Sequence, residues 1–481
     1  MYQPAIVNFP VFSVAWSEAT DEQGITTPAV LTAGGGGAGS TGVGNKISLI
    51  TFKGGAEHPE HSIACELETS PETSTCVAAS RNGQLMAGAF GKTVRVYANL
   101  PSGLHKLAEF RGDHAENDSS INSMAFSDAL SNGVTVLATG GEDGVLRVWE
   151  LSAVRNGGGA ALLNGARNGD GDRIASLDPT LVSECGGHGK SITCVRFHPS
   201  AAVILTASKD GTCRLWDWRR GAQAAVLATT SGLPSSVQAP IVMCRACCFA
   251  PHKPDAIFTV QSGPRGKAYV TEWKYSVGFK DDSYGRDGSG GMGGQGNRGA
   301  IACAVEPLRV KCVSPHPATT LSVRGDGARL AVGNAEGTVL VYRVPGFAKV
   351  MEYRAHDLTV TGLAFAPGDL GTALGGYDLL AGSADYKITL LKSQGSAAKL
   401  AVGQVVGGLW WFIWTILTSV LWLLRVVISV IMTVIPLLGL LVIGAAVVYY
   451  PQNVYDIIAV ALGWESGAGS WDDVGRTPVI A

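Results

Sequence analysis

The chain has 481 residues, and its 37 Lys and Arg against 39 Asp and Glu give a formal net charge of −2. Nucleic-acid binding needs a surplus of cations to neutralise phosphates, so this balance argues against nucleic acid as a partner. Glycine accounts for 63 residues and charged residues for only 16%. The regular apolar segments described below indicate that these glycines serve tight turns rather than a disordered chain.

The first distinctive segment is a glycine-rich loop between two expected strands, residues 28–33 and 47–50. Gly37-x-Gly39-x-x-Gly42 matches a dinucleotide-binding fingerprint, but that motif needs a following helix, whose N-terminal amides hold the pyrophosphate. A strand is expected here instead. Gly44-Asn45-Lys46-Ile47 also lacks the Gly-Lys-Ser/Thr of a phosphate-binding P-loop. Both nucleotide motifs are therefore excluded.

Such a loop can present its backbone to a partner, because consecutive glycines leave amides and carbonyls unobstructed by Cβ atoms. Convergent backbone carbonyls between Gly34 and Asn45 could also hold a hard monovalent cation, as carbonyl rings do in channel filters. The alternative is a flexible surface loop without a function. Four glycines followed by Thr41-Gly42-x-x-Asn45 between two strands form too particular a pattern for that alternative.

Seven segments share one pattern, in which an apolar stretch is followed by small residues, a turn and a second apolar stretch that closes on a large residue. Asp143-Gly144 and Asp210-Gly211 supply strong hairpin turns in the two clearest segments. Successive closing positions lie 47 (97 − 50) to 69 (342 − 273) residues apart, which fits one propeller blade of about 40–45 residues plus a loop. The closing pairs are Leu49-Ile50, Val96-Tyr97, Val148-Trp149, Leu215-Trp216, Glu272-Trp273, Val341-Tyr342 and Leu390-Leu391.

The sequence therefore predicts an all-β fold, a seven-bladed β-propeller over residues 1–395. The fourth unit resembles the WD-repeat family most closely, with His188 upstream, Asp210 in the turn and Trp216-Asp217 at the strand end. This resemblance implies that His188, Asp210 and Trp216 form a buried hydrogen-bonded set that is structural rather than catalytic. His356 resembles the entry to the last blade, also with a structural role.

Two glycine-rich inserts, near residues 153–180 and 276–300, contain few large apolar residues and are predicted to be surface loops. The 10 cysteines all precede the apolar C-terminal segment, in a region expected to be reducing, so we expect free thiols. Cys244-x-x-Cys247-Cys248 lacks a second pair at zinc spacing and lies in an apolar strand-like stretch. Core packing is the favoured interpretation of these cysteines.

Between Val405 and Tyr450 the only charged residue is Arg425. Residues 426–449 form an uncharged stretch of 24 residues (449 − 426 + 1), which as a helix would be about 36 Å long and could cross a bilayer. We expect residues 396–425 to form a linker and interfacial helix, residues 426–450 a transmembrane helix and residues 451–481 a short tail. A membrane hairpin is the alternative, but residues 423–427 offer no turn and the leg after Pro436 is short.

The flanking charges predict the orientation of the span. Basic residues concentrate before it, which places that side in the cytosol, and acidic residues follow it. No N-terminal signal peptide is apparent, so the propeller should be cytosolic and the tail should lie on the far side. Glycosylation at the Asn117-Asp118-Ser119 sequon would contradict this topology. The basic residues are Lys387, Lys392, Lys399 and Arg425, and the acidic ones are Asp456, Glu465, Asp472 and Asp473.

The loop also carries a family resemblance. Gly34-Gly35-Gly36-Gly37-x-Gly39-x-x-Gly42-Val43-x-Asn45-Lys46-Ile47, in the first blade of a propeller with a C-terminal span, resembles the endoplasmic-reticulum exchange factors for the Sar-type small GTPase (the prolactin regulatory element-binding protein family). The resemblance implies a single-pass protein of the endoplasmic-reticulum membrane that starts coat protein complex II vesicle budding. It further implies that potassium orders the loop, that the loop contacts the GTPase, and that Asn45 takes part in exchange, for which we expect Asn45 to contact the GTPase directly.

The residues that the resemblance assigns to GTPase and cation binding, besides Asn45, are Gly34, Gly35, Gly36, Gly37, Gly39, Thr41, Gly42, Val43, Lys46 and Ile47. Exchange would involve no covalent chemistry and no organic cofactor, and coat proteins are further candidate partners. Two alternatives stay open. One is a non-catalytic membrane-anchored scaffold that assists endoplasmic-reticulum exit of a cargo such as a phosphate transporter. The other is a propeller adaptor on a different membrane.

Overall fold

The chain forms two compact units, Met1–Gly395 and Ser396–Ala481. The computed structural model describes residues 4–462 except residues 22, 38, 40–41, 55–58, 117–118, 128–134, 154–175, 201, 235–241, 252, 254, 280–300, 369, 395–396, 450–452, 454–456 and 459. Thr41, the sequon at Asn117 and most of the two glycine-rich inserts therefore lie outside the described residues.

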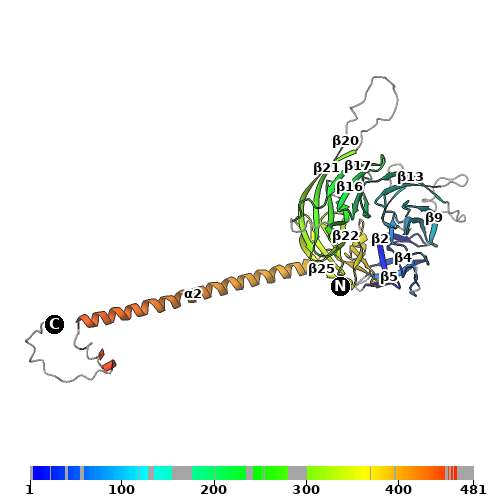
Figure 1. The fold of residues 1–481 in the computed structure, drawn as a ribbon. Helices are drawn as coiled ribbons and strands as arrows, with labels where there is room; N and C mark the ends of the chain where they lie inside the picture. The colour runs from blue at the N-terminus through cyan, green and yellow to red at the C-terminus, as the bar shows by residue number, and fades with distance from the viewer. Residues whose placement is uncertain are drawn as a thin grey trace, which may run out of the picture. The chain divides into compact units, whose positions relative to one another are not determined.

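The first unit consists of seven four-stranded antiparallel sheets that follow one another around a ring (Figure 1). The first three blades are β2 (Val11–Thr20), β3 (Thr26–Gly34), β4 (Lys46–Lys53) and β5 (Glu60–Glu68); β6 (Cys76–Ala79), β7 (Leu85–Phe90), β8 (Thr93–Leu100) and β9 (Gly103–Arg111); and β10 (Ile121–Phe126), β11 (Thr135–Gly141), β12 (Leu146–Ala153) and β13 (Leu177–Cys185).

The next three blades are β14 (Ile192–Phe197), β15 (Ile204–Ser208), β16 (Thr212–Asp217) and β17 (Ala222–Ala228); β18 (Met243–Phe249), β19 (Ala256–Ser262), β20 (Ala268–Phe279) and β21 (Ile301–Ser314); and β22 (Ala318–Val323), β23 (Arg329–Asn334), β24 (Thr338–Arg343) and β25 (Ala348–Arg354). The last comprises β26 (Val360–Phe365), β27 (Leu379–Ser383), β28 (Lys387–Leu391) and β1 (Ala5–Ile6), and the four-residue helix α1 (Leu370–Ala373) connects β26 to β27.

The predicted seven-bladed propeller is confirmed. Each of the seven closing pairs lies in the third strand of its blade, from Leu49-Ile50 in β4 to Leu390-Leu391 in β28. The turns at Asp143-Gly144 and Asp210-Gly211 connect second to third strands, as the hairpin signals indicate. The large residue that ends each closing pair is buried, because both faces of a blade pack against neighbouring blades.

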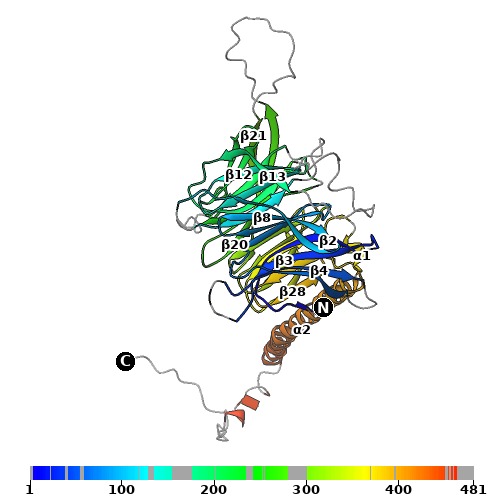
Figure 2. The ribbon, with the colours of Figure 1, turned by 90° about the vertical axis from the view of Figure 1, so that its right-hand side faces the viewer.

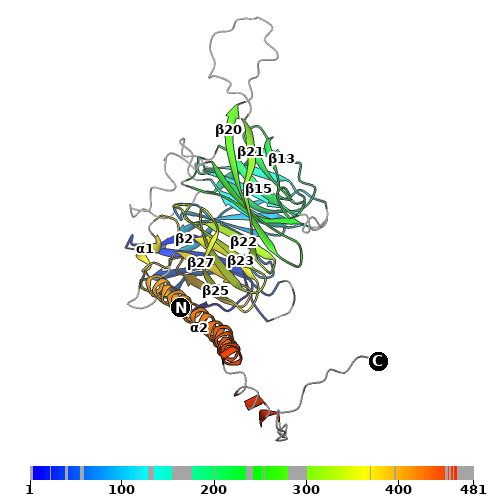
Figure 3. The same cartoon turned by 90° about the vertical axis from the view of Figure 1, so that its left-hand side faces the viewer.

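The ring is closed by the N-terminal segment. β1 completes the last blade by pairing with β28, with Ala5 opposite Ile388 and Ile6 opposite Lys387. β2 then packs against β26 and β27, so the first blade lies beside the last (Figure 2). Between the sixth and seventh blades β22 and β23 pack against β26 in the same way (Figure 3). A closed ring of this kind leaves only short protected strand edges.

The core lies between the blades, where inner strands of neighbouring sheets contact each other all around the ring. Trp216, Trp273 and Phe258 are among the largest fully buried side chains. Burying a large aromatic side chain removes roughly 150–250 Å² from water, so these residues contribute strongly to holding adjacent blades together.

The second unit contains α2 (Ala397–Tyr449), one helix of 53 residues that includes Pro436. Within it, Trp414–Tyr449 is long and apolar enough to cross a membrane, by length and composition, and none of this stretch is buried. The hydroxyls of Thr418 and Thr433 donate to the carbonyls of Trp414 (3.0 Å) and Ser429 (2.7 Å), four residues earlier. Their polar groups are therefore satisfied within the helix, as a lipid environment requires.

The helix differs from the sequence expectation at one point. We expected an interfacial helix to end near Arg425 and a separate span to begin at Val426, but the backbone is helical through Arg425 without interruption. Arginine is a good helix former, so a single charged residue gives the backbone no reason to break. No turn of a membrane hairpin occurs between Ala397 and Tyr449.

Candidate functional site

The glycine-rich loop connects β3 to β4 in the first blade. Its base is closed by Gly34, which lies opposite Val11 of β2 on one side and Lys46 of β4 on the other. A Cβ atom at Gly34 would lie 1.8 Å from the carbonyl oxygen of Pro10, so only glycine permits this close approach of two backbones. The Gly35 amide donates to the same Pro10 oxygen at 3.2 Å.

Asn45 lies beneath the loop and holds it. The residue is 1% exposed, and its Oδ1 accepts from the Gly37 amide while its Nδ2 donates to the Gly37 carbonyl, both at 3.0 Å. Nδ2 also donates to the Pro71 carbonyl (3.0 Å), and Oδ1 also accepts from the Thr73 hydroxyl (2.8 Å). Both acceptor positions on Oδ1 and both hydrogens on Nδ2 are therefore hydrogen-bonded. A buried polar side chain stabilises a fold when its hydrogen bonds are satisfied in this way.

Pro71 and Thr73 belong to the connection between β5 and β6, and we call its residues 69–73 the brace. β3 and β5 are both antiparallel to β4 and so run in the same direction. The loop after β3 and the brace after β5 therefore lie at the same end of the sheet. The Thr69 amide donates to the Asn45 carbonyl at 2.8 Å, and the Asn45 amide donates to the Ser70 hydroxyl at 3.1 Å. Backbone and side chain of Asn45 are thus both fixed by the brace.

Gly35 fits against Asn45 so closely that a Cβ atom there would lie 2.2 Å from Oδ1 and 2.6 Å from Cα of Asn45. Its φ of +144°, and those of Gly37 (+83°) and Gly42 (+75°), lie in the region that favours glycine. The glycines in this loop therefore serve two needs, namely space at Gly34 and Gly35 and backbone conformation at Gly35, Gly37 and Gly42.

The other residues predicted for the site divide between the surface and the core. Gly39 and Gly42 are exposed near the tip of the loop, whereas Gly36 and Val43 are half-buried. Lys46 forms an ion pair with Glu66 at 2.9 Å. Ile47 is 1% exposed and belongs to the core between the first two blades, so it supports the loop from below and offers no surface to a partner.

The donor set around the loop consists of oxygens, which fits a hard cation. Two carbonyls of the predicted range already accept hydrogen bonds, that of Gly37 from Asn45 and that of Asn45 from Thr69. The Glu68 carboxylate lies 3.1 Å from the Cβ position of Gly44 and adds an anionic oxygen beside the loop. Oxygen ligands of this kind suit hard cations rather than soft metals, and the potassium ion stays a prediction.

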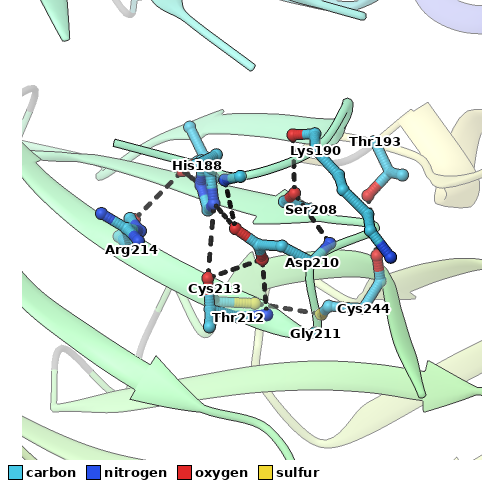
Figure 4. Close-up of polar contacts among 12 residues, drawn as sticks. His188, Lys190, Thr193, Ser208, Asp210, Gly211, Thr212, Cys213, Arg214 and Cys244 are labelled. Carbon is cyan, nitrogen blue, oxygen red and sulfur yellow. Dashed lines mark hydrogen bonds and ion pairs between the residues drawn. The ribbon is translucent and has the colours of Figure 1, made fainter. Parts of the chain in front are cut away.

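The residues predicted as a structural set in the fourth blade lie together, and Figure 4 shows the contact between His188 and Asp210. His188 Nδ1 lies 2.9 Å from Asp210 Oδ2, and the His188 ring packs edge-on against Trp216 with centroids 6.0 Å apart. Burial alone would raise the pKa of Asp210, but hydrogen bonds from His188 and Thr212 outweigh it and hold that pKa well below its ordinary range. Asp210 therefore stays ionised and serves as a fixed acceptor.

Sequence reasoning missed the fourth member of this set. The Thr206 hydroxyl lies 2.8 Å from both His188 Nε2 and Trp216 Nε1 and connects the two rings. Trp149 bonds to Thr139 in the third blade, and Trp273 to Thr259 in the fifth, in the same way. The sequence carries a signal for this contact. A threonine stands ten residues before Trp149 and before Trp216, and fourteen residues before Trp273.

The last blade has the histidine and the aspartate of this set but not the threonine. His356 Nδ1 lies 3.1 Å from Asp385, and burial lowers the pKa of His356 against the attraction of Asp385. Nε2 of His356 is buried without a hydrogen-bond partner among the described residues. The reason is that Ala381 stands four residues before Asp385, where the fourth blade has Thr206.

Ala381→Ser is expected to stabilise the protein by about 1 kcal/mol, because a serine hydroxyl would donate to the unpartnered nitrogen of His356. The measurement is the midpoint of urea unfolding of the full chain in detergent. In a His356→Leu background the same substitution should bring no gain, since the acceptor is then absent. An equal gain in both backgrounds would show that the hydroxyl bonds elsewhere.

All ten cysteines are free thiols. Cys244 and Cys247 are fully buried and Cys248 is 7% exposed, all within the core between the fourth and fifth blades. Burial raises the pKa of the Cys76 thiol to about 12, which keeps that thiol protonated and unreactive. Within the described parts of the chain no group of three or more His, Cys, Asp or Glu side chains could hold a metal ion.

The fold and the His–Thr–Trp sets define a WD-repeat β-propeller with a C-terminal apolar helix. The family described as WD domain, G-beta repeat matches residues 106–150 and 179–217, which cover strands of the second to fourth blades. The WD repeat domain-containing protein 83 homolog of Dictyostelium discoideum is 31% identical over 71 residues. That similarity covers 15% of this chain and 22% of the relative, so it extends over about a fifth of the relative's length.

Proposed function

We propose that the chain is a guanine-nucleotide exchange factor for a Sar-type small GTPase, anchored in the endoplasmic-reticulum membrane with its propeller in the cytosol. The observation that carries the proposal is the loop of residues 34–46. It is closed at its base by Gly34, held from below by Asn45, and exposed at Gly39 and Gly42 near its tip. A loop that is held at its base in this way, and that has only Gly, Ala, Ser and Thr from Gly34 to Gly42, suits close contact with the backbone of a partner.

Exchange of this kind depends on binding energy alone. A factor that binds the empty GTPase better than the loaded one weakens nucleotide binding by the same factor. Loosening a pM complex to μM requires about 8 kcal/mol, more than one side chain supplies. Because internal hydrogen bonds hold the loop before a partner arrives, less of the interaction energy is lost to ordering it.

In this proposal Asn45 acts through the loop. Its amide makes four hydrogen bonds inside the chain, and a direct bond to the GTPase would first require some of them to break. These bonds support a role in holding the loop in the shape that the GTPase meets. The potassium ion, when bound, would be held by loop carbonyls and would fix the loop by neutralising their converging dipoles.

A membrane-anchored scaffold without exchange activity is the second candidate. The observation that favours it is the burial of Asn45, which is 1% exposed and therefore offers little polar surface to a partner. In that case the propeller would hold proteins near the membrane, and the loop would be one part of a binding surface. The two candidates differ in a single measurable property, the rate of nucleotide release from a bound GTPase.

Asn45→Ala is expected to slow GDP release about 100-fold, because it removes all the side-chain bonds that hold Gly37. The assay uses the full chain in lipid nanodiscs and a Sar-type GTPase loaded with fluorescent GDP. Asn82→Ala, in an exposed turn of the second blade, is the control and should release GDP normally. If the unmodified chain does not accelerate release, the exchange function is wrong and the scaffold becomes the favoured candidate.

The same assay tests the cation. Replacing potassium by lithium should slow release about tenfold if carbonyls of residues 34–45 hold the ion, because lithium is too small for a site shaped for potassium. Equal rates in both salts would remove the cation from the proposal and leave exchange itself intact.

A further inference from the structure

We infer that the brace, residues 69–73, positions the glycine-rich loop, and that the Thr73 hydroxyl helps to hold the Asn45 amide in the orientation that the Pro71 carbonyl requires. The inference rests on the proposed exchange function, to which it adds a positioning residue outside the loop. It is carried by the hydrogen bonds that converge on one buried amide.

The brace decides which way round the Asn45 amide lies. The amide has two acceptor positions on Oδ1 and two donor hydrogens on Nδ2. The Pro71 carbonyl, 3.0 Å from Nδ2, can only accept, and the Thr73 hydroxyl, 2.8 Å from Oδ1, donates. With these two partners in place, the oxygen faces Thr73 and the nitrogen faces Pro71.

The orientation of the amide then decides whether the loop is held. Oδ1 faces the N–H of Gly37 and Nδ2 faces its carbonyl, both at 3.0 Å, so the amide binds the two backbone groups of one residue. A flipped amide would set oxygen against oxygen and N–H against N–H, and both bonds would be lost. Gly37 has a φ of +83°, a conformation that this two-point contact helps to maintain.

The brace is itself fixed to the second blade. Glu72 forms an ion pair with Arg95 of β8, and Arg95 also pairs with Glu109 of β9 at 3.3 Å. The Arg95 guanidinium lies 4.4 Å from the centre of the Phe90 ring, a cation–π contact that limits its movement. The loop of the first blade is therefore oriented from the second blade, through Thr73 and Asn45.

Thr73→Val removes the hydroxyl and keeps the shape of the side chain. In the full chain in nanodiscs, we expect about tenfold faster hydrogen exchange at the Gly37 amide and about tenfold slower GDP release from the GTPase. Thr73→Ser should restore both values, because it returns the hydroxyl. Thr75→Val is the matched control, since Thr75 bonds to the Ile121 carbonyl (3.0 Å) and not to Asn45.

The two readouts separate the inference from the proposed function. Unchanged protection of the Gly37 amide in Thr73→Val, or failure of Thr73→Ser to restore it, would overturn the positioning role. The unmodified chain could fail to accelerate GDP release from the GTPase while Thr73→Val still loses protection of the Gly37 amide. The positioning role then stands and the exchange function fails. Normal GDP release alongside lost protection would show that the loop orientation does not govern exchange, and would also overturn the inference.

Discussion

Gly35→Ala will slow nucleotide release at least about 100-fold and lower the stability of the propeller by about 2–5 kcal/mol. Its Cβ would lie 2.6 Å from the Cα of Asn45, so β4 or the loop must shift. Overpacking of this kind costs about 1–3 kcal/mol, and the φ of +144° adds strain of about 1–2 kcal/mol for a residue with a Cβ. Urea unfolding and the GDP-release assay measure the two effects.

Gly24→Ala separates strain from collision. Gly24 also has a positive φ, +79°, but no atom lies within 4 Å of its Cβ position. The substitution should cost about 1–2 kcal/mol from strain alone and leave GDP release unchanged. A Gly35→Ala protein with normal stability and normal release would mean that the loop does not pack on Asn45.

Trp216→Ala should destabilise the protein by about 3–5 kcal/mol, among the largest effects of any single substitution outside the loop. The side chain is 1% exposed, packs against His188 and bonds to Thr206 at 2.8 Å. Its removal leaves a cavity between blades and takes a partner from Thr206. The shift of the urea midpoint in the full chain in detergent gives the cost.

Trp216→Phe is the matched variant for that measurement. It keeps a six-membered aromatic ring and loses the N–H that bonds to Thr206 together with the rest of the five-membered ring, so a loss of about 1–2 kcal/mol is expected. Equal losses in Trp216→Phe and Trp216→Ala would place the whole contribution in the hydrogen bond. A negligible loss in both would mean that the ring does not hold the blade.

The propeller could be predicted because each blade repeats a local pattern. Asp143-Gly144 and Asp210-Gly211 fix their hairpins within a few residues, and buried residues such as Trp149 and Trp216 mark the third strands. These signals depend on neighbours in the chain, so a sequence shows them directly. The apolar helix was predictable for the same reason, since length and hydropathy are local properties.

Two of the features that sequence reasoning missed depend on distant partners, and the third is a helix boundary. β1 has two residues, Ala5 and Ile6, too few for an alternation of apolar and polar residues to be recognised. Thr206 gives no signal until the register places it beside His188 and Trp216. The continuity of α2 through Arg425 could not be anticipated, because one arginine carries little information about a helix boundary.

The candidate site was predicted in composition but not in arrangement. The glycines and Asn45 are recognisable as a unit, but no sequence pattern indicates that Pro71 and Thr73 complete the bonding of Asn45 from 26 and 28 residues away. A side chain that looks available in a sequence can be fully bonded once the chain folds. This is why Asn45 was first expected to meet the GTPase directly.

The pairing of β1 with β28 also determines when the ring can close during biosynthesis. Ile6 leaves the ribosome 381 residues (387 − 6) before its partner Lys387, which at about 5–20 residues per second is roughly 20–80 s. Throughout that time β1 has no partner strand, so the ring stays open. The apolar α2 begins at Ala397, so the last blade can be completed only as the ribosome starts to deliver the segment that is a candidate for membrane insertion.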